Sequence, residues 1–166
     1  MFYRFEKYYF KDDGTIPNSR LPVILYHQIC AEKDTSEWLE QHFKINGWTN
    51  NWRDIVLPYD HFHSTTHEVL GVGKGSVVLH IGGKNGLSLS VSAGDVLILP
   101  AGVGHYALTD DKNYEIVGGY PEGKSWDLLR GSDDERKIAF SNLEKLSIPS
   151  TDPIFGLEGE LLKLWL

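Results

Sequence analysis

Cysteine is nearly absent from this chain, because Cys30 is the only one among 166 residues. No intramolecular disulfide can form, and we therefore expect a protein of the reducing cytoplasm. A surplus of positive charge is missing too: 16 Lys and Arg stand against 23 Asp and Glu, for a formal net charge of −7. No basic cluster offsets this balance, so we expect neither nucleic acid nor an anionic membrane as a partner.

Long apolar runs are also missing. The stretch LPVILYHQICA, residues 21–31, is too short and too polar to cross a bilayer, which takes about 20 residues. The first ten residues, MFYRFEKYYF, mix charges with aromatic rings and contain no apolar core of a signal peptide. We therefore expect a soluble protein of one domain, long enough to bury a hydrophobic core.

Short apolar segments separated by turn signals fill residues 52–121. In residues 87–91, LSLSV, apolar side chains alternate with serines, which predicts a strand with one buried face. Residues 95–100, DVLILP, are apolar almost throughout, which predicts burial on both faces, and the glycine-rich residues 82–86 predict a hairpin loop. Strands at this spacing without intervening helices indicate an all-β sandwich or barrel.

Two extensions are expected to flank this core. Residues 1–51 should pack on the barrel through a strand near residues 21–27 and a short helix, for which Asp34 or Thr35 would be the cap. Asn46-Gly47 is the expected end of that helix.

The other extension, residues 122–166, contains a helical pattern at residues 132–146 with acidic residues at its start. For its last segment, ELLKLWL, we expect a terminal strand, and a short helix is the alternative. So apolar an end is expected to dock on the barrel or on a partner.

Three histidines and a glutamate lie within residues 61–68, HFHSTTHE. If HFH is a strand, His61 and His63 point to the same face. If Glu68, which opens the next strand, points inward, its carboxylate meets the two imidazoles in a site for a first-row divalent metal. Adjacent residues of a strand face opposite ways, which turns His67 outward, but a bulge would make His67 the ligand and Glu68 its neighbour.

A second segment, residues 94–109, carries another histidine. After the apolar strand, Pro100 and Gly102 bend the chain, and His105 starts the next strand. In an antiparallel barrel His105 could come alongside the first cluster and supply a third nitrogen. The periodicity permits this convergence without establishing it.

These two segments resemble the two motifs of the cupin superfamily. In the first, two histidines in H-x-H are followed after three or four residues by Glu and after six more by Gly, as in His61, His63, Glu68 and Gly75. Ile55 departs from this motif, because a glycine usually stands six residues before the first histidine.

In the second cupin motif, Gly is followed after five residues by P-x-G-x-x-H, as in Gly94, Pro100, Gly102 and His105. Thr109 departs from it, because this motif often ends in Asn. A fuller likeness, to uncharacterised bacterial YjlB-like cupins, extends over nearly the whole chain, through PNSRLPVILY, NGW, THEVLGV, LPAGVGH, GGYPEG and WDL.

The resemblance implies a cupin-type (jelly-roll) small β-barrel that holds one divalent transition metal: Mn, Fe, Ni, Zn or Cu. The implied ligands are His61, His63, Glu68 and His105. Cupins include dioxygenases, decarboxylases, isomerases and proteins that bind without catalysis. We expect a dioxygenase-like oxidoreductase, or an isomerase or decarboxylase, acting on a small oxygenated substrate, with Glu68 both ligand and proton acceptor. The alternative is a non-catalytic binder or sensor of a small molecule or metal chelate.

Other residues carry weaker signals. Trp52, Tyr59 and Tyr106 are candidates for the mouth of a pocket, with Tyr59 favoured because it shares its strand parity with the histidines. Gly71 and Gly73 indicate bends of the barrel, room for a substrate, or both. The other histidines (His27, His42 and His80) are expected to be structural or exposed. Apolar ends and the sheet edges of small cupins suggest a homodimer.

Overall fold

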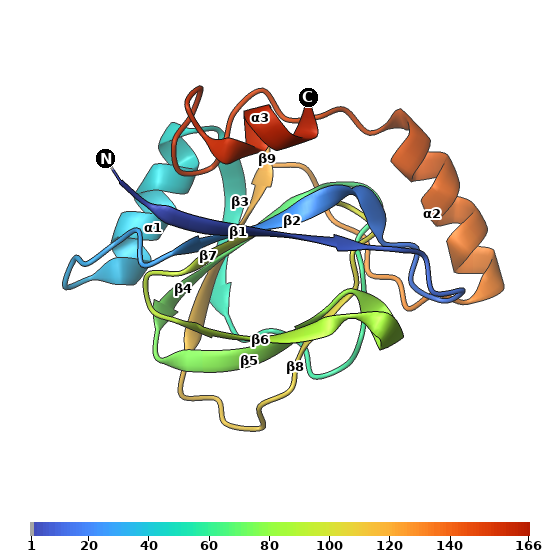
Figure 1. Ribbon diagram of the computed structural model, residues 1–166, viewed down its shortest axis with the longest axis horizontal. Coiled ribbons are helices and arrows are strands. Elements are labelled where there is room, and N and C mark those ends of the chain that lie inside the picture. Colours follow the sequence, from blue (N-terminus) through green and yellow to red (C-terminus); the bar gives the residue numbers. More distant parts are fainter. Residues whose placement is uncertain (1) are drawn as a thin grey trace.

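Two antiparallel sheets pack against each other in residues 2–166, the part of the chain that the computed structural model describes (Figure 1). The larger sheet consists, in spatial order, of β1 (Arg4–Phe10), β2 (Ser19–His27), β7 (Val96–Leu99), β4 (Glu68–Lys74), β9 (Glu115–Pro121) and β3 (Trp48–Asp54). The smaller sheet consists of β6 (Leu87–Ser92), β5 (Ser76–Ile81) and β8 (His105–Ala107). This is the expected all-β, cupin-type jelly roll with short helices, although the two sheets are not closed into one ring of strands.

The N-terminal residues belong to the larger sheet and are not an extension packed on it. In β2, Ile24 pairs with Ile98 of β7, so β1 and β2 continue the hydrogen-bonded ladder. The expected boundary between residues 51 and 52 falls inside β3, which pairs with β9. Backbone pairing between distant segments decides this arrangement, and no local signal in the sequence reports it.

Helix α1 (Thr35–Ile45) begins as predicted, because the Asp34 carboxylate accepts the N–H of Glu37 at 3.1 Å. The helix packs on the outer face of β4, where Gly71 and Gly73 let it approach. A Cβ at Gly73 would lie 1.9 Å from Ser36 Oγ, and one at Gly71 would lie 2.9 Å from a methyl group of Leu39. Both glycines thus face α1, so the idea that they make room for a substrate is wrong.

Helix α2 (Asp133–Lys145) also forms where the sequence predicts it. Ser132 and Glu135 form a capping box at its start. The glycine-rich loop between β5 and β6 is the expected hairpin connection and contains a short 3-10 turn, Gly83–Asn85.

The C-terminal segment is helical, so the expectation of a terminal strand is wrong. Helix α3 (Glu160–Trp165) docks on the larger sheet beside β2, as Figure 1 shows. Leu161 and Trp165, four residues apart, are both buried on the same side of this helix. Because the larger sheet offers these two side chains an apolar face, the helix is the conformation that buries both. The expected docking of this apolar end is confirmed.

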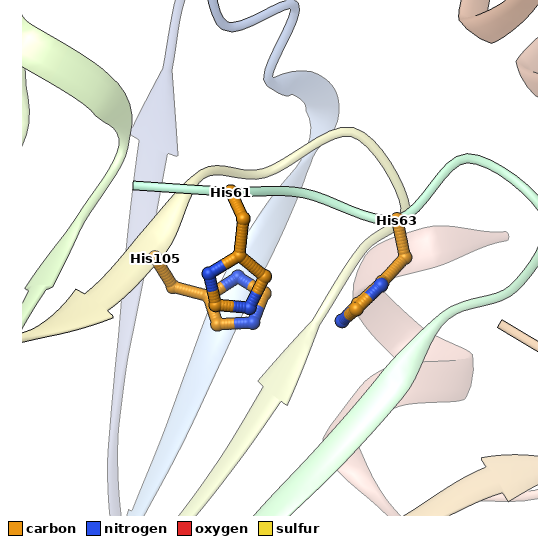
Figure 2. Close-up of side chains that lie close together, drawn as sticks. All are labelled: His61, His63 and His105. Atoms are coloured by element: carbon orange, nitrogen blue, oxygen red, sulfur yellow. The ribbon is translucent and has the colours of Figure 1, made fainter. Parts of the chain in front are cut away.

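The segment with the first two histidines runs antiparallel to β8. His61 and His105 exchange backbone hydrogen bonds at 3.4 and 2.9 Å, and Phe62 pairs with Leu129. HFH is therefore a two-residue bridge and not the separate strand expected. The alternation still holds: Figure 2 shows His61 and His63 pointing from this segment toward the ring of His105, whereas Phe62 packs in another cluster with Ile16.

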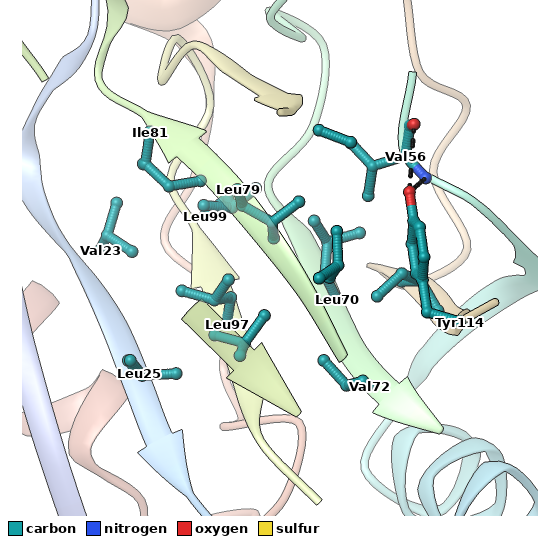
Figure 3. Packing of buried hydrophobic residues seen from close by; sticks show 14 of the residues in the cluster. Val23, Leu25, Val56, Leu70, Val72, Leu79, Ile81, Leu97, Leu99 and Tyr114 are labelled. Atoms are coloured by element: carbon teal, nitrogen blue, oxygen red, sulfur yellow. Dashed lines mark hydrogen bonds between the residues drawn. The ribbon is translucent and has the colours of Figure 1, made fainter. Parts of the chain in front are cut away.

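The main core lies between the two sheets (Figure 3). Leu70 and Val72 of β4 point into it from the larger sheet, and Leu79 from β5 of the smaller one. The intervening Val69 points the other way, into a second cluster covered by α1 and α3. Strand β7 is buried on both faces, as predicted. Side chains alternate along β4, so Glu68, two residues before Leu70, also lies on the inner face of the sheet.

No helix within residues 2–166 is both long enough and apolar enough to cross a membrane.

Candidate metal centre

Three buried imidazoles converge at one end of the core. One ring nitrogen from each of His61, His63 and His105 lies within 4.8 Å of the corresponding nitrogens of the other two. The first two residues come from the bridge segment and the third from the start of β8 (Figure 2). The convergence of two distant segments that the sequence permitted is thus present in the structure.

Hydrogen bonds to backbone carbonyls determine which nitrogen of each neutral imidazole carries the proton. Nδ1 of His61 lies 2.9 Å from the carbonyl of Tyr59, and Nδ1 of His105 lies 3.0 Å from that of Val103. Nδ1 of His63 contacts the carbonyl of Asp127 in the same way. A carbonyl only accepts hydrogen bonds, so each Nδ1 carries the proton and each Nε2 keeps a free lone pair. Metal-binding histidines are typically held in this way.

Glu68 completes the group from the first position of β4. Its Oε2 lies 3.2 Å from Nε2 of His63 and 3.2 Å from Nε2 of His105. Within the described residues this buried oxygen has no hydrogen-bond partner. When both imidazoles are neutral, three atoms with lone pairs thus face one another, and a cation between them, either a metal ion or a proton on His63, relieves the repulsion. The separation is close to the roughly 3 Å expected between neighbouring ligands whose bonds to a metal are about 2.1 Å.

The charges in this group depend on one another. The pKa of Glu68 is lowered: burial would raise it, but His63 and His105 outweigh burial. Burial, followed by the neighbouring His105, lowers the pKa of His61 to about 3. At neutral pH the group therefore offers a carboxylate anion and a neutral imidazole, which are good ligands for a divalent transition metal.

A proton competes with metal at His63. Burial lowers the pKa of this imidazole, but the charge of Glu68 outweighs that effect and raises the pKa. Metal binding must displace this proton, and we expect metal affinity to fall as the pH drops, starting above the ordinary histidine value of about 6.5. Zinc titrations at a series of pH values measure this. An affinity that stays constant between about pH 8 and pH 6 would contradict it.

Tyr120 of β9 holds the Glu68 carboxylate in place, a role that no local pattern in the sequence indicates. Its hydroxyl donates to Glu68 Oε1 at 3.1 Å and accepts the indole N–H of Trp52 at 2.8 Å. The pair holds the carboxylate so that Oε2 points to the imidazoles. Burial, with the charge of Glu68, raises the pKa of Tyr120, so this hydroxyl stays protonated.

We expect Tyr120→Phe to weaken metal binding by about 10- to 100-fold, the usual effect of losing a contact that orients a ligand. The fold should survive, with a loss of about 1–3 kcal/mol in the free energy of unfolding, because the Trp52 N–H loses its acceptor. Zinc titration and urea unfolding measure the two effects. Tyr106→Phe is the matched control, because this ring packs against His80 outside the site. Equal zinc affinities of the two variants would refute the role.

Asp127 anchors the turn between the two parts of the first motif and was also missed. Its carboxylate accepts the backbone N–H groups of Ser64 and Thr65 at 2.6 and 3.2 Å, while its own carbonyl contacts His63. Because Asp127 lies more than 60 residues from these partners, no local pattern could have indicated the contact.

His67 lies on the opposite side of the strand from Glu68, as the parity argument predicts. Its Nδ1 accepts the N–H of Ala101 at 2.9 Å, its Nε2 donates to the carbonyl of Ser147 at 3.2 Å, and its ring packs on Trp165. Both nitrogens are thus engaged away from the centre. Burial lowers the pKa of His67 to about 4.

A cavity of about 380 Å³ opens onto the three histidines and Glu68. Trp52 lines it, as the sequence suggested. Tyr59 and Tyr106 do not: Tyr59 lies under the guanidinium of Arg130 and touches His61 edge-on. The remaining lining residues are Asn50, Asn51, Asp54, Ile55, Val56, Leu57, Leu70, Tyr120, Trp126 and Leu128.

Solved structures with a similar arrangement include acireductone dioxygenase from Bacillus anthracis with cadmium in its active centre, at 17% identity and a TM-score of 0.40 over 55% of this chain and 61% of that one. Another is Bacillus subtilis oxalate decarboxylase with Mn(II) centres, at 16% identity and a TM-score of 0.41 over 71% of this chain and 30% of that one. The chain thus spans less than two thirds of either protein, and likeness at this level establishes no shared reaction.

The sequence matches no protein-family model. It does match the uncharacterised protein YjlB of Bacillus subtilis, with 37% identity over 161 residues that cover 96% of each chain. A match of this identity over nearly the whole length, on a jelly roll that carries both cupin motifs, establishes kinship: the chain belongs to the cupins of the YjlB family.

Proposed function

We propose that this protein binds one divalent transition metal through His61, His63, Glu68 and His105, and that it acts there on a small oxygenated molecule. The observation that carries the proposal is the orphaned Oε2 of Glu68, which lies 3.2 Å from two imidazole nitrogens. Burying such a set without a cation is costly. The open cavity beside it provides access for a second molecule.

The proposed activity is that of a dioxygenase-like oxidoreductase, with isomerase or decarboxylase activity as the other catalytic options. A bound ion would supply Lewis acidity or, as Fe, Mn or Cu, one-electron chemistry. The chain would contribute three fixed imidazoles, apolar walls that exclude water, and Glu68 as the group that accepts a proton. Tyr120 would hold Glu68 in place throughout.

A non-catalytic binder or sensor is the second candidate, and one observation favours it. Besides the four proposed ligands, the lining residues of the cavity include only Asp54 and Tyr120 as groups that titrate, and Asp54 is exposed. The described cavity therefore offers no second buried carboxylate or imidazole for acid–base catalysis.

Two measurements separate these candidates. Elemental analysis of the purified protein should find about one equivalent of a transition metal. Oxygen uptake and product analysis with a panel of diols, flavonoids and keto acids then test for turnover. Bound metal with no consumption of any substrate would favour the binder, and a protein that takes up no metal would exclude the metal-dependent enzyme and leave only a binder that needs no resident metal. The cytoplasmic location and the homodimer stay predictions, and sedimentation analysis tests the latter.

A further inference from the structure

We propose that the molecule bound at this centre is an apolar compound with one bidentate oxygen group that carries a single negative charge. A small dicarboxylate would not suit the cavity. The inference rests on the metal site proposed above and adds the chemical class of the ligand. It follows from the charges and the walls of the cavity.

The charges limit the ligand first. The lining contains no Lys or Arg among the described residues, and its two charged side chains, Asp54 and Glu68, are both acidic. Asp54 is exposed, so water screens its charge. Among the buried charges, a divalent cation and the Glu68 carboxylate sum to one positive charge. A ligand with one negative charge neutralises this sum, whereas a dianion leaves a net negative charge without a protein partner. Such an uncompensated charge is costly between apolar walls.

The walls limit the ligand next. Ile55, Val56 and Leu57 are consecutive lining residues, and Trp126 and Leu128 line the cavity from a separate segment of the chain. The Trp126 ring contacts His63, with 5.6 Å between the ring centroids, so an apolar surface begins directly beside the proposed ligands.

The hydrogen-bond donors of Asn51, Trp52 and Val56 in this wall are already occupied. The Oδ1 of Asn51 has no partner among the described residues, but it is an acceptor and cannot bind an anion. The indole N–H of Trp52 donates to Tyr120, and the backbone N–H of Val56 donates to the hydroxyl of Tyr114. These donors are therefore not free to recognise a polar substrate. A cavity of about 380 Å³ lies within the range of about 300–1,000 Å³ that is usual for small-molecule pockets, so an apolar group fits beside the oxygen atoms that chelate.

Three hydroxamates test the inference, because they share one singly charged chelating group. Zinc-loaded protein is titrated calorimetrically with acetohydroxamate, benzohydroxamate and 4-carboxybenzohydroxamate, and the zinc content is measured afterwards to show that the ion stays bound. We expect benzohydroxamate to bind at least tenfold more tightly than acetohydroxamate, since only it reaches the apolar wall. 4-Carboxybenzohydroxamate should bind at least tenfold more weakly than benzohydroxamate, because the lining offers its carboxylate no positive charge.

Two substitutions assign the effects to the cavity. Trp126→Ala should reduce the preference for the phenyl group at least threefold without changing the zinc content. Leu57→Arg, at an exposed lining position, should restore binding of the carboxylated probe at least threefold. Leu108→Arg is the control, because Leu108 is similarly exposed but lies outside the lining.

The outcomes separate this inference from the metal site. Failure of the wild-type protein to retain zinc would overturn the metal site, and this inference with it. Zinc retained with acetohydroxamate bound as tightly as benzohydroxamate, or with the carboxylated probe bound as tightly as the plain one, would overturn the ligand class and leave the metal site standing. The same holds if no hydroxamate binds the zinc-loaded protein.

Discussion

His105→Ala is expected to empty the metal site while the protein stays folded. The substitution removes one of three imidazoles and one of the two nitrogens next to Glu68 Oε2. We expect metal affinity to fall by more than about 100-fold, beyond the effect of losing a merely orienting contact. The two sheets keep their apolar core, because none of its residues is changed. Elemental analysis and circular dichroism measure the two results.

His67→Ala is the matched control, since it removes a buried imidazole on the other side of the same strand. Metal content should stay near that of the wild type, although stability falls because the Ala101 N–H loses its acceptor. His63→Ala should behave like His105→Ala. If His67→Ala emptied the site and Glu68→Gln did not, the assignment of Glu68 as the ligand would be wrong.

Asp152→Ala is expected to destabilise the fold by about 3–5 kcal/mol, the cost of opening a buried polar network. The carboxylate is fully buried. It accepts the hydroxyl of Tyr26 at 2.6 Å and the backbone N–H groups of Ile154 and Phe155 at 2.9 and 3.0 Å. The N–H of Leu161 reaches the same group at 3.3 Å. Its removal leaves the donors of Tyr26, Ile154 and Leu161 buried without an acceptor.

Urea unfolding measures this loss, with Asp110→Ala as the control at an exposed position. Tyr26→Phe should cost less, because the carboxylate then keeps its backbone partners. At low denaturant, Asp152→Ala should still bind metal, because the network ties α3 to β2 on the outer face of the larger sheet, away from the histidines. A free energy of unfolding within about 0.5 kcal/mol of the wild type would show that the network contributes little.

Local signals in the sequence were sufficient for the elements that depend on neighbours along the chain. Helices α1 and α2 begin directly after Asp34 and Ser132 because each of these side chains accepts an N–H three residues ahead. The opposite orientations of His67 and Glu68 follow from the alternation of a strand, which needs no knowledge of the partner strands. The candidate donors were recognisable for the same reason, since their spacing is part of the sequence.

Local signals in the sequence do not predict contacts between segments that lie far apart in the chain. Tyr120 reaches Glu68 only because β9 pairs with β4, and Asp127 reaches Ser64 only because its segment folds back over the turn. The segment ELLKLWL suits a strand or a helix equally well by composition. The apolar face of the larger sheet, which receives Leu161 and Trp165, selects the helix.

Residue type and spacing alone identify the side chains that can bind a cation and the direction in which each leaves its own backbone, because strand alternation is a local property. The folded arrangement of distant segments brings His105 to the first motif, joins the N-terminal strands to the sheet, and leaves the cavity walls apolar and without a positive charge. These features arise from pairing and packing between segments far apart in the chain, and their energies do not depend on any local pattern.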